Sequence, residues 1–196
     1  MAPRQNTVVG TDGKARCGWA SADPLYEKYH DREWGRPLKD DHALFELLIL
    51  EGCQAGLSWI TVLRKREHYR KVYDDFDAQK IARYTPAKLA KLLADPGIIR
   101  HRGKIAASVT NAQAFLKLVE REGSFHRWLR KVVGEQPSTR PRTLKDVPAR
   151  TPQSDALAKA LAKEGFKFVG STICYAFLQA SGMVDDHVVG CHRRRD

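Results

Sequence analysis

SDALAKALAKEGFKFVGSTICYAFLQASG, residues 154–182, holds two helix-length segments separated by a short turn. The first segment ends at Gly165 and the second at Gly182, where a helix C-cap favours glycine. The turn between them ends at Gly170, immediately before Ser171 opens the second segment. The stretch therefore predicts two helices joined by a short turn.

The rest of the chain continues this helical pattern. Thr85 is a typical N-cap, Pro86 suits the first helical position, and Pro96-Gly97 is a stop signal. Segments with helical start signals or apolar spacing cover residues 42–52, 59–73, 85–97, 104–120 and 124–133. Because we find no strand-length alternation and no repeat, the predicted fold class is all-α.

The chain is long enough for one domain with a substantial core. We expect a flexible leader over residues 1–15, a single domain of two closely packed helical lobes over residues 16–192, and a basic tail over 193–196. A proline-rich stretch, 134–152, is expected to be an extended connector. The longest apolar run, ALFELLILEG, is too short to cross a bilayer and no signal peptide is seen, so the expected location is cytoplasmic.

Charge and cysteine content narrow the function. Lys and Arg number 34 against 23 Asp and Glu, a net charge of +11, which favours a polyanionic partner, although a basic surface can also have no ligand. Four cysteines without an export signal favour metal binding or free thiols over disulfides.

His187 and Cys191 stand four positions apart, and the N-terminal region offers Cys17 and His30. Together they form a Cys2His2 set drawn from the two ends of the chain, the complement of a structural zinc site with no position left for water. His192 is a competing ligand. The alternative is that Cys17 and His30 have no metal to bind.

A second cluster surrounds Glu51, an acid at the end of an almost wholly apolar helix, where a carboxylate is unfavourable unless it meets a donor or cation. Trp59 follows across a turn, and further aromatic residues lie in the segment that carries Cys17 and His30: Trp19, Tyr26, Tyr29 and Trp34. Aromatic faces with one acid form a receptor for a flat cationic ring. The simpler alternative is a solvent-facing Glu51 and a core Trp59.

Five blocks, in order, carry a resemblance to a known family: RCGWASADPLYEKYHDREWG, LEGCQAGLSWITVLRKRE, GIIRHRGKI, GFKFVGSTICYAF and DHVVGC. They resemble the DNA-3-methyladenine glycosylase I family of the helix-hairpin-helix superfamily, over residues 16–191. The resemblance implies a monomeric bacterial repair enzyme that flips N3-methyladenine out of double-stranded alkylated DNA and hydrolyses its glycosidic bond.

The resemblance also implies roles for particular residues. In this family the zinc is structural, and its ligands correspond to Cys17, His30, His187 and Cys191. The base-recognising and catalytic acid falls on Glu51. The base-binding aromatic residues are Trp19, Tyr29, Trp34 and Trp59.

Two kinds of DNA contact are predicted. Gly170 and Ser171 stand at a helix N-terminus, which can bind a phosphate. Leu57 could insert into the DNA and fill the gap that the flipped base leaves. Leu57 could equally pack on its own helix, and the basic segments 64–71 and 100–104 could be solvated faces. Ser171 stands where related bifunctional enzymes have a lysine, so no lyase activity is expected. Asp185 is an outside candidate for a catalytic acid.

Two other classes of protein compete with this interpretation. A catalytic zinc hydrolase would need three protein ligands and an open position for water. A DNA-binding module without chemistry would explain the charge but not Glu51 beside an aromatic cluster.

Overall fold

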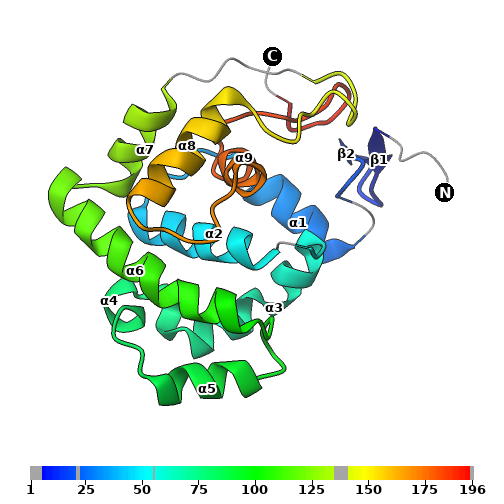
Figure 1. Ribbon diagram of the computed structural model, residues 1–196. Coiled ribbons are helices and arrows are strands. Elements are labelled where there is room, and N and C mark those ends of the chain that lie inside the picture. The colour runs from blue at the N-terminus through cyan, green and yellow to red at the C-terminus, as the bar shows by residue number, and fades with distance from the viewer. Residues whose placement is uncertain (1–5, 21–22, 55, 135–140, 195–196) are drawn as a thin grey trace.

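The computed structural model describes residues 6–20, 23–54, 56–134 and 141–194. Over these residues the chain forms a two-stranded hairpin, nine α-helices and one 3-10 turn (Figure 1). Their bounds are β1 Thr7–Val9, β2 Ala15–Cys17, α1 Pro24–Arg32, α2 Asp41–Gln54, α3 Trp59–Val72, η1 Asp74–Phe76, α4 Ala78–Ile81, α5 Pro86–Ala94, α6 Arg102–Glu122, α7 Phe125–Val133, α8 Pro152–Lys163 and α9 Ser171–Ala180. The predicted helical class is confirmed.

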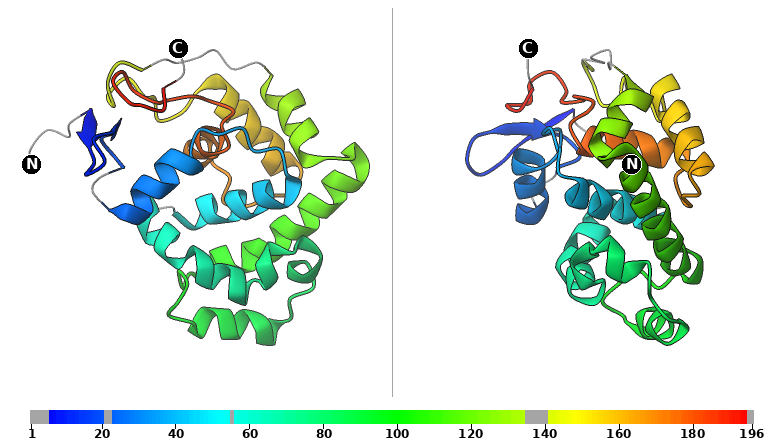
Figure 2. Two further views of the ribbon diagram at one scale, coloured as in Figure 1. Left: turned by 180° about the vertical axis from the view of Figure 1, so that it is seen from behind. Right: turned by 90° about the vertical axis from the view of Figure 1, so that its left-hand side faces the viewer.

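Helix α2 runs through the middle of the molecule, with α3 to α5 on one side and α7 to α9 on the other (Figures 1 and 2). It packs against α3, α6, α7 and α9. Leu44, Phe45, Leu48 and Leu50 are almost fully buried on it, as the apolar composition of its sequence requires. Because α2 is enclosed on several sides, its C-terminal residues are held at the centre of the molecule.

Most predicted helix starts carry the expected cap. Asp40 Oδ1 accepts from the Ala43 N–H at 2.8 Å, and Thr85 Oγ1 accepts from the Lys88 N–H at 3.3 Å. Ser58 precedes α3, but its hydroxyl pairs with Thr61 Oγ1 instead of the backbone.

Helices α1 and α4 were not predicted, although each has a sequence signal. Asp23, followed by Pro24, accepts from two backbone N–H groups and opens α1, and Asp77 does the same for α4. Both helices are short, so their apolar period is too brief to identify them.

The prediction that the chain has no strands was wrong at its N-terminal end. Strands β1 and β2 pair antiparallel, with Thr7 opposite Cys17. Arg16 binds Asp12 and Asp31 at 2.8 and 2.7 Å, which fixes the hairpin to α1. Three-residue strands are too short to show alternation, so the sequence pattern could not reveal them.

The hairpin begins within the segment predicted to be a flexible leader, whose residues 1–5 lie outside the described residues. In the predicted tail, Arg194 donates to the Pro141 carbonyl at 2.8 Å. The first and the last described segments are therefore both tied to neighbouring parts of the chain.

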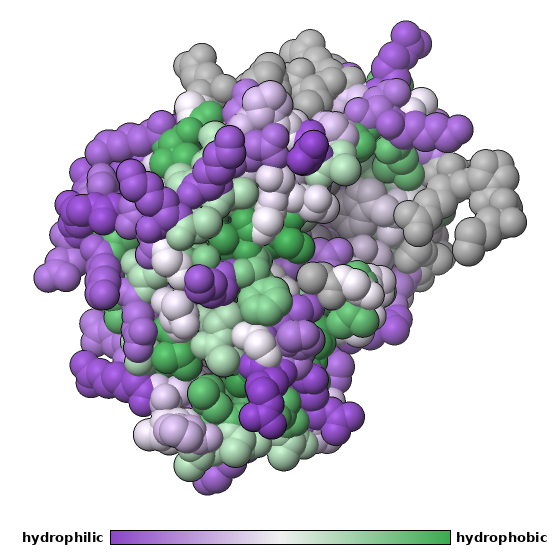
Figure 3. Space-filling view, in the orientation of Figure 1, coloured by the Kyte–Doolittle hydropathy of each residue, from purple (hydrophilic) through white to green (hydrophobic). Residues whose placement is uncertain are grey.

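One face of the molecule shows how polar and apolar side chains are distributed. On the face shown in Figure 3, hydrophilic side chains follow much of the outline and hydrophobic ones gather towards the middle. Within the part of the chain that the structure describes, none of the helices combines the length and apolar character needed to cross a membrane.

Candidate ligand cavity and metal-ligand cluster

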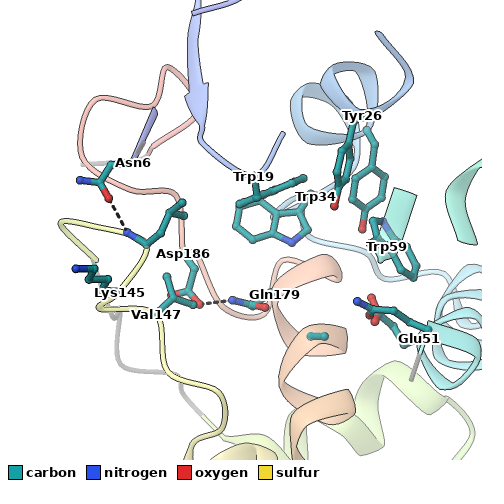
Figure 4. A pocket seen from close by; sticks show the side chains of 14 residues that line it. Asn6, Trp19, Tyr26, Trp34, Glu51, Trp59, Lys145, Val147, Gln179 and Asp186 are labelled. Atoms are coloured by element: carbon teal, nitrogen blue, oxygen red, sulfur yellow. Dashed lines mark hydrogen bonds between the residues drawn. The ribbon is translucent and has the colours of Figure 1, made fainter. Parts of the chain in front are cut away.

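A cavity of about 560 Å³ lies beside the C-terminal end of α2 (Figure 4). Glu51 and Gln54 reach it from α2, Trp59 from the start of α3, and Ala176 and Gln179 from α9. An aromatic wall comes from the hairpin end and α1: Trp19, Tyr26, Tyr29 and Trp34. Every predicted base-binding residue therefore lines the same space.

The aromatic rings of this wall contact one another. The ring centroids of Trp19 lie 5.1 Å from Tyr26 and 4.9 Å from Trp34, and those of Tyr29 and Trp59 are 5.6 Å apart. Such edge and tilted packing fixes the rings in place before a ligand arrives. A preformed aromatic wall favours a flat, electron-poor ring over other shapes of ligand.

Glu51 is 3% exposed, and burial raises the pKa of its carboxyl to about 8. At neutral pH the empty cavity therefore holds this acid mainly in its protonated form. A cation bound beside it would lower that pKa and release the proton. The predicted recognition acid is thus neutral until a positive charge arrives.

Three buried polar atoms around the cavity have no hydrogen-bond partner among the residues placed in the structure: Glu51 Oε2, Tyr29 Oη and Trp59 Nε1. Leaving a buried polar atom unpaired costs about 1–3 kcal/mol. Unpaired groups on one cavity are therefore expected to meet their partners on a ligand.

The metal-ligand cluster joins the two ends of the chain. Ligand atoms of Cys17, His30 and Cys191 all lie within 4.8 Å of one another, and all three residues are buried. Cys191 Sγ is 3.4 Å from His30 Nε2. A hydrogen bond from the Cys17 thiol to Cys191 holds the pKa of Cys191 below its ordinary value. This favours the Cys191 thiolate, the form that binds metals.

His187, the fourth predicted ligand, lies next to this cluster, with its ring centroid 5.2 Å from that of His30. Its Nε2 atom is buried without a partner in the described part of the chain, whereas Nδ1 binds Asp185 Oδ1 at 2.7 Å. His30 Nδ1 binds Asp31 in the same way, at 2.9 Å. A carboxylate on one imidazole nitrogen orients the other towards a metal.

The competing ligand does not join this set. His192 Nδ1 lies 2.9 Å from the Ala15 carbonyl, and its ring centroid is 6.0 Å from that of His30. Asp185, considered as a catalytic acid, binds His187 and does not line the cavity; its neighbour Asp186 does.

The cluster and the aromatic wall touch directly. The ring centroids of Trp34 and His187 are 4.6 Å apart, and those of Trp19 and His30 are 5.2 Å apart. Any shift of the ligand residues therefore moves the rings that line the cavity.

The predicted DNA contacts lie at the surface. Leu57 is 43% exposed in a turn that Gly56 makes with φ of +82°. Gly170 is the exposed N-cap of α9 and, as a glycine, provides no capping side chain for the first N–H groups of the helix, which begin at Ser171. These positions agree with the predicted contacts but do not test them.

The two basic segments differ. Arg64 pairs with Asp23, Arg66 with Glu33, and Arg70 with Glu46, so the segment 64–71 mainly joins α3 to α1 and α2. Arg100 and Arg102 are exposed and form no ion pair with a described residue. The second segment therefore has more charge free for a polyanion.

Sequence reasoning missed several cavity residues. Gln54 lies one helical turn after Glu51 and could have been found from that spacing. Asn6 and the connector residues Leu144, Lys145 and Val147 form the facing wall, and no local pattern indicated them.

Fold and site together define a small helical protein with an aromatic-walled cavity that holds one buried acid, next to a metal-ligand cluster. Residues 19–194 match the methyladenine glycosylase family, and the chain belongs to that family.

Individual relatives agree with this assignment. The chain is 54% identical to DNA-3-methyladenine glycosylase 1 of Escherichia coli, over 90% of this chain and 95% of that protein. It is 46% identical to DNA-3-methyladenine glycosylase of Haemophilus influenzae, over 90% and 96%. A solved structure of 3-methyladenine DNA glycosylase I superposes with a TM-score of 0.89 at 52% identity, covering 92% of this chain and 100% of that one. A structure that describes 3-methyladenine recognition by the 3-methyladenine DNA glycosylase I of Staphylococcus aureus superposes with a TM-score of 0.85 at 38% identity. The match covers 90% of this chain and 94% of that one.

Proposed function

We propose that this chain removes N3-methyladenine from alkylated double-stranded DNA by hydrolysing its N-glycosidic bond. The observation that carries this proposal is the buried Glu51, unpaired and facing the aromatic wall, in a chain that belongs to the methyladenine glycosylase family.

The chemistry of the lesion suits this cavity. Methylation at N3 puts a positive charge on adenine, and each aromatic face favours a cation by about 0.5–2 kcal/mol. Normal adenine lacks the charge and gains none of this preference. A duplex hides the base, so the nucleotide must swing out of the stack to reach the cavity, with Leu57 filling the gap.

Glu51 supplies the charge-dependent part of recognition. The cationic base lowers the pKa of Glu51 from about 8, the carboxyl releases its proton, and the carboxylate accepts a hydrogen bond from the amino edge of the base. Hydrolysis breaks the bond between the sugar C1′ and the base nitrogen. The bonding pair cancels the positive charge of the base, while water gives its hydroxyl to C1′ and its proton to solvent.

Zn²⁺ is the metal that best suits the cluster, since two thiolates and two imidazoles are its preferred structural set. Cys17, His30 and Cys191 would hold it together with His187, whose unpaired Nε2 is the remaining donor. Four protein ligands leave no position for water, so the role is structural and a catalytic zinc hydrolase is disfavoured. Its position against Trp19 and Trp34 would keep the aromatic wall in place.

The proposed enzyme acts as a monomer and leaves an abasic site with both strands intact. Ser171 and Thr172 follow the hairpin glycine, so no lysine stands there to attack the sugar. Lys145 is a lysine on the cavity wall, at the edge away from Glu51 (Figure 4). A strand-cleaving activity lost in Lys145→Ala would contradict the monofunctional assignment.

The test is to incubate dimethyl-sulfate-treated duplex DNA with the protein and identify the released purines by chromatography. We expect 3-methyladenine to be released, and the strands to break only after alkali treatment. Mild chelation should reduce activity only together with the folded fraction. If no methylated purine appeared above the protein-free background, the chain would be a DNA-binding module at most, and the proposal would be wrong.

A further inference from the structure

The wall that faces Glu51 consists of two segments far apart in the sequence. Asn6, just before β1, and the connector residues Leu144, Lys145 and Val147 line the cavity opposite Glu51 and Trp59 (Figure 4). The family match begins at residue 19, so Asn6 and the hairpin lie outside the matched range. Membership of the family therefore assigns no role to Asn6.

Asn6 forms hydrogen bonds with both sides of the cavity. Its side-chain Oδ1 accepts from the Leu144 N–H at 3.2 Å, the contact drawn in Figure 4. Its backbone carbonyl accepts from the Gly18 N–H at 2.7 Å, and Gly18 directly precedes Trp19 of the aromatic wall. One residue thus joins the connector wall to the segment after β2 that carries Trp19.

The cavity-lining part of the connector packs Leu144 and Val147 against the hydrophobic core, but its backbone has few other hydrogen bonds. Its earlier end is held by a hydrogen bond from the Val189 N–H to the Pro141 carbonyl. Asp146 accepts from the Arg142 and Thr143 N–H groups, which closes a local turn. Among the described residues, the bond to Asn6 is the only long-range hydrogen bond made by residues 143–147.

We propose that Asn6 is a positioning residue for base binding: it fixes the separation of the two walls and holds Leu144 and Val147 towards the captured base. This inference rests on the proposed function. The two apolar side chains, half-buried at the cavity, exclude water from it. In a drier site the attraction between the ligand, Glu51 and the aromatic faces is stronger. Without the Asn6 side chain the connector is released, and the affinity for the base falls.

The experiment measures the Kd of free 3-methyladenine by tryptophan fluorescence, and kcat and KM on methylated duplex DNA. We expect Asn6→Ala to raise Kd and KM about 2- to 12-fold, the effect of losing one ordering hydrogen bond. At saturation kcat should stay within about twofold of wild type, because the group acts on binding and not on the bond-breaking step. The melting temperature should change by no more than about 2 °C.

Two further variants separate positioning from general damage to the hairpin. Asn6→Asp keeps the accepting Oδ1 and should bind the free base as the wild type does. Asp12→Asn removes a charge that Arg16 contacts in the same hairpin, away from the cavity, and should also bind normally.

A wild-type Kd for Asn6→Ala would overturn the inference while leaving the proposed function intact. An equal loss in Asp12→Asn would also overturn it, because the whole hairpin and not Asn6 would then be responsible. A wild-type chain that neither bound nor released 3-methyladenine would overturn both the proposed function and this inference.

Discussion

At the scale of single residues, Glu51 has opposite effects on stability and on binding. It lies almost without solvent contact, and Oε2 has no partner in the described chain. An ionised carboxylate there is unfavourable until a cation arrives. The burial on which the proposed selectivity of Glu51 for a charged base rests therefore destabilises the ligand-free protein at alkaline pH.

This conflict predicts the pH dependence of the Glu51→Gln variant. Burial raises the pKa of Glu51 from 4.5 to about 8 in the folded protein. At any pH between these two values, Glu51 is therefore mainly protonated in the folded state and mainly ionised in the unfolded state. Wild-type stability therefore falls as pH rises from about 5 to 8. Glutamine does not titrate, so the variant should be nearly as stable as the wild type at pH 4.5. At pH 8.5 it should be more stable, by on the order of 1–4 kcal/mol.

Urea unfolding at the two pH values measures this difference. Glu46→Gln is the matched control: Glu46 lies on the same helix, is 8% exposed and pairs with Arg70, so removing its charge should lower stability. A stability gain in Glu51→Gln that did not change with pH would rule out titration of Glu51 as the cause.

The sequence was sufficient to single out Glu51 and the aromatic residues that line the cavity, because they lie in two short segments with unusual composition. It could not identify Asn6 as a cavity residue. Its partner Leu144 is 138 positions away, and neither residue has a chemistry that marks a site. Contacts of this kind depend on how the chain ends come together, which no local pattern encodes.

At the scale of elements, the N-terminus of α9 is the feature best suited to a phosphate. Gly170 leaves the first N–H groups of the helix without a capping side chain. A helix N-terminus carries a partial positive charge and attracts anions. The same end should therefore gain stability from a negative side chain and lose affinity for DNA.

Ser171→Glu tests this expectation, because the change should raise the stability of the protein and lower its affinity for DNA. The variant should be as stable as the wild type or more stable, by about 0.3–1 kcal/mol from the helix dipole. It should bind duplex DNA roughly 3- to 30-fold more weakly, because the carboxylate repels a phosphate at the same place. Thermal unfolding and fluorescence anisotropy measure the two quantities.

Ala87→Glu places the same charge in the first turn of α5 and serves as the control, with DNA binding expected to stay close to wild type. Equal binding of DNA by Ser171→Glu and the wild type would show that α9 does not receive a phosphate.

Helices with a cap, an apolar period and a stop were predicted well, as α5 with Thr85, Pro86 and Pro96 shows. Helix α1 was missed because its nine residues, PLYEKYHDR, carry mainly polar groups. The hairpin was missed because its stability comes from Arg16 with Asp12 and Asp31, and Asp31 belongs to a different element.

At the scale of the whole molecule, the metal-ligand cluster closes the chain on itself. Holding Cys17 next to Cys191 costs about 4–5 kcal/mol of loop entropy. Bound structural zinc contributes on the order of 10–16 kcal/mol. Because Trp34 contacts His187, this closure also fixes the aromatic wall of the cavity.

Cys191→Ala should therefore lower zinc content and stability together. We expect less than one zinc per chain by atomic emission and a melting temperature lower by on the order of 10 °C. Cys174→Ala, a buried cysteine on α9 outside the cluster, should keep its zinc and lose less stability. If Cys191→Ala kept both its zinc and its melting temperature, the cluster would not be the metal site.

We propose above that Glu51 recognises a cationic base in this cavity. The most direct test is the rate at which 3-methyladenine is released from alkylated duplex DNA by the wild type, by Glu51→Gln and by Glu46→Gln. We predict that Glu51→Gln lowers kcat/KM about 10- to 100-fold, the value of a charge-assisted hydrogen bond to the base, while Glu46→Gln stays within about threefold of wild type. Release by Glu51→Gln at the wild-type rate, or an equal loss in both variants, would contradict the account.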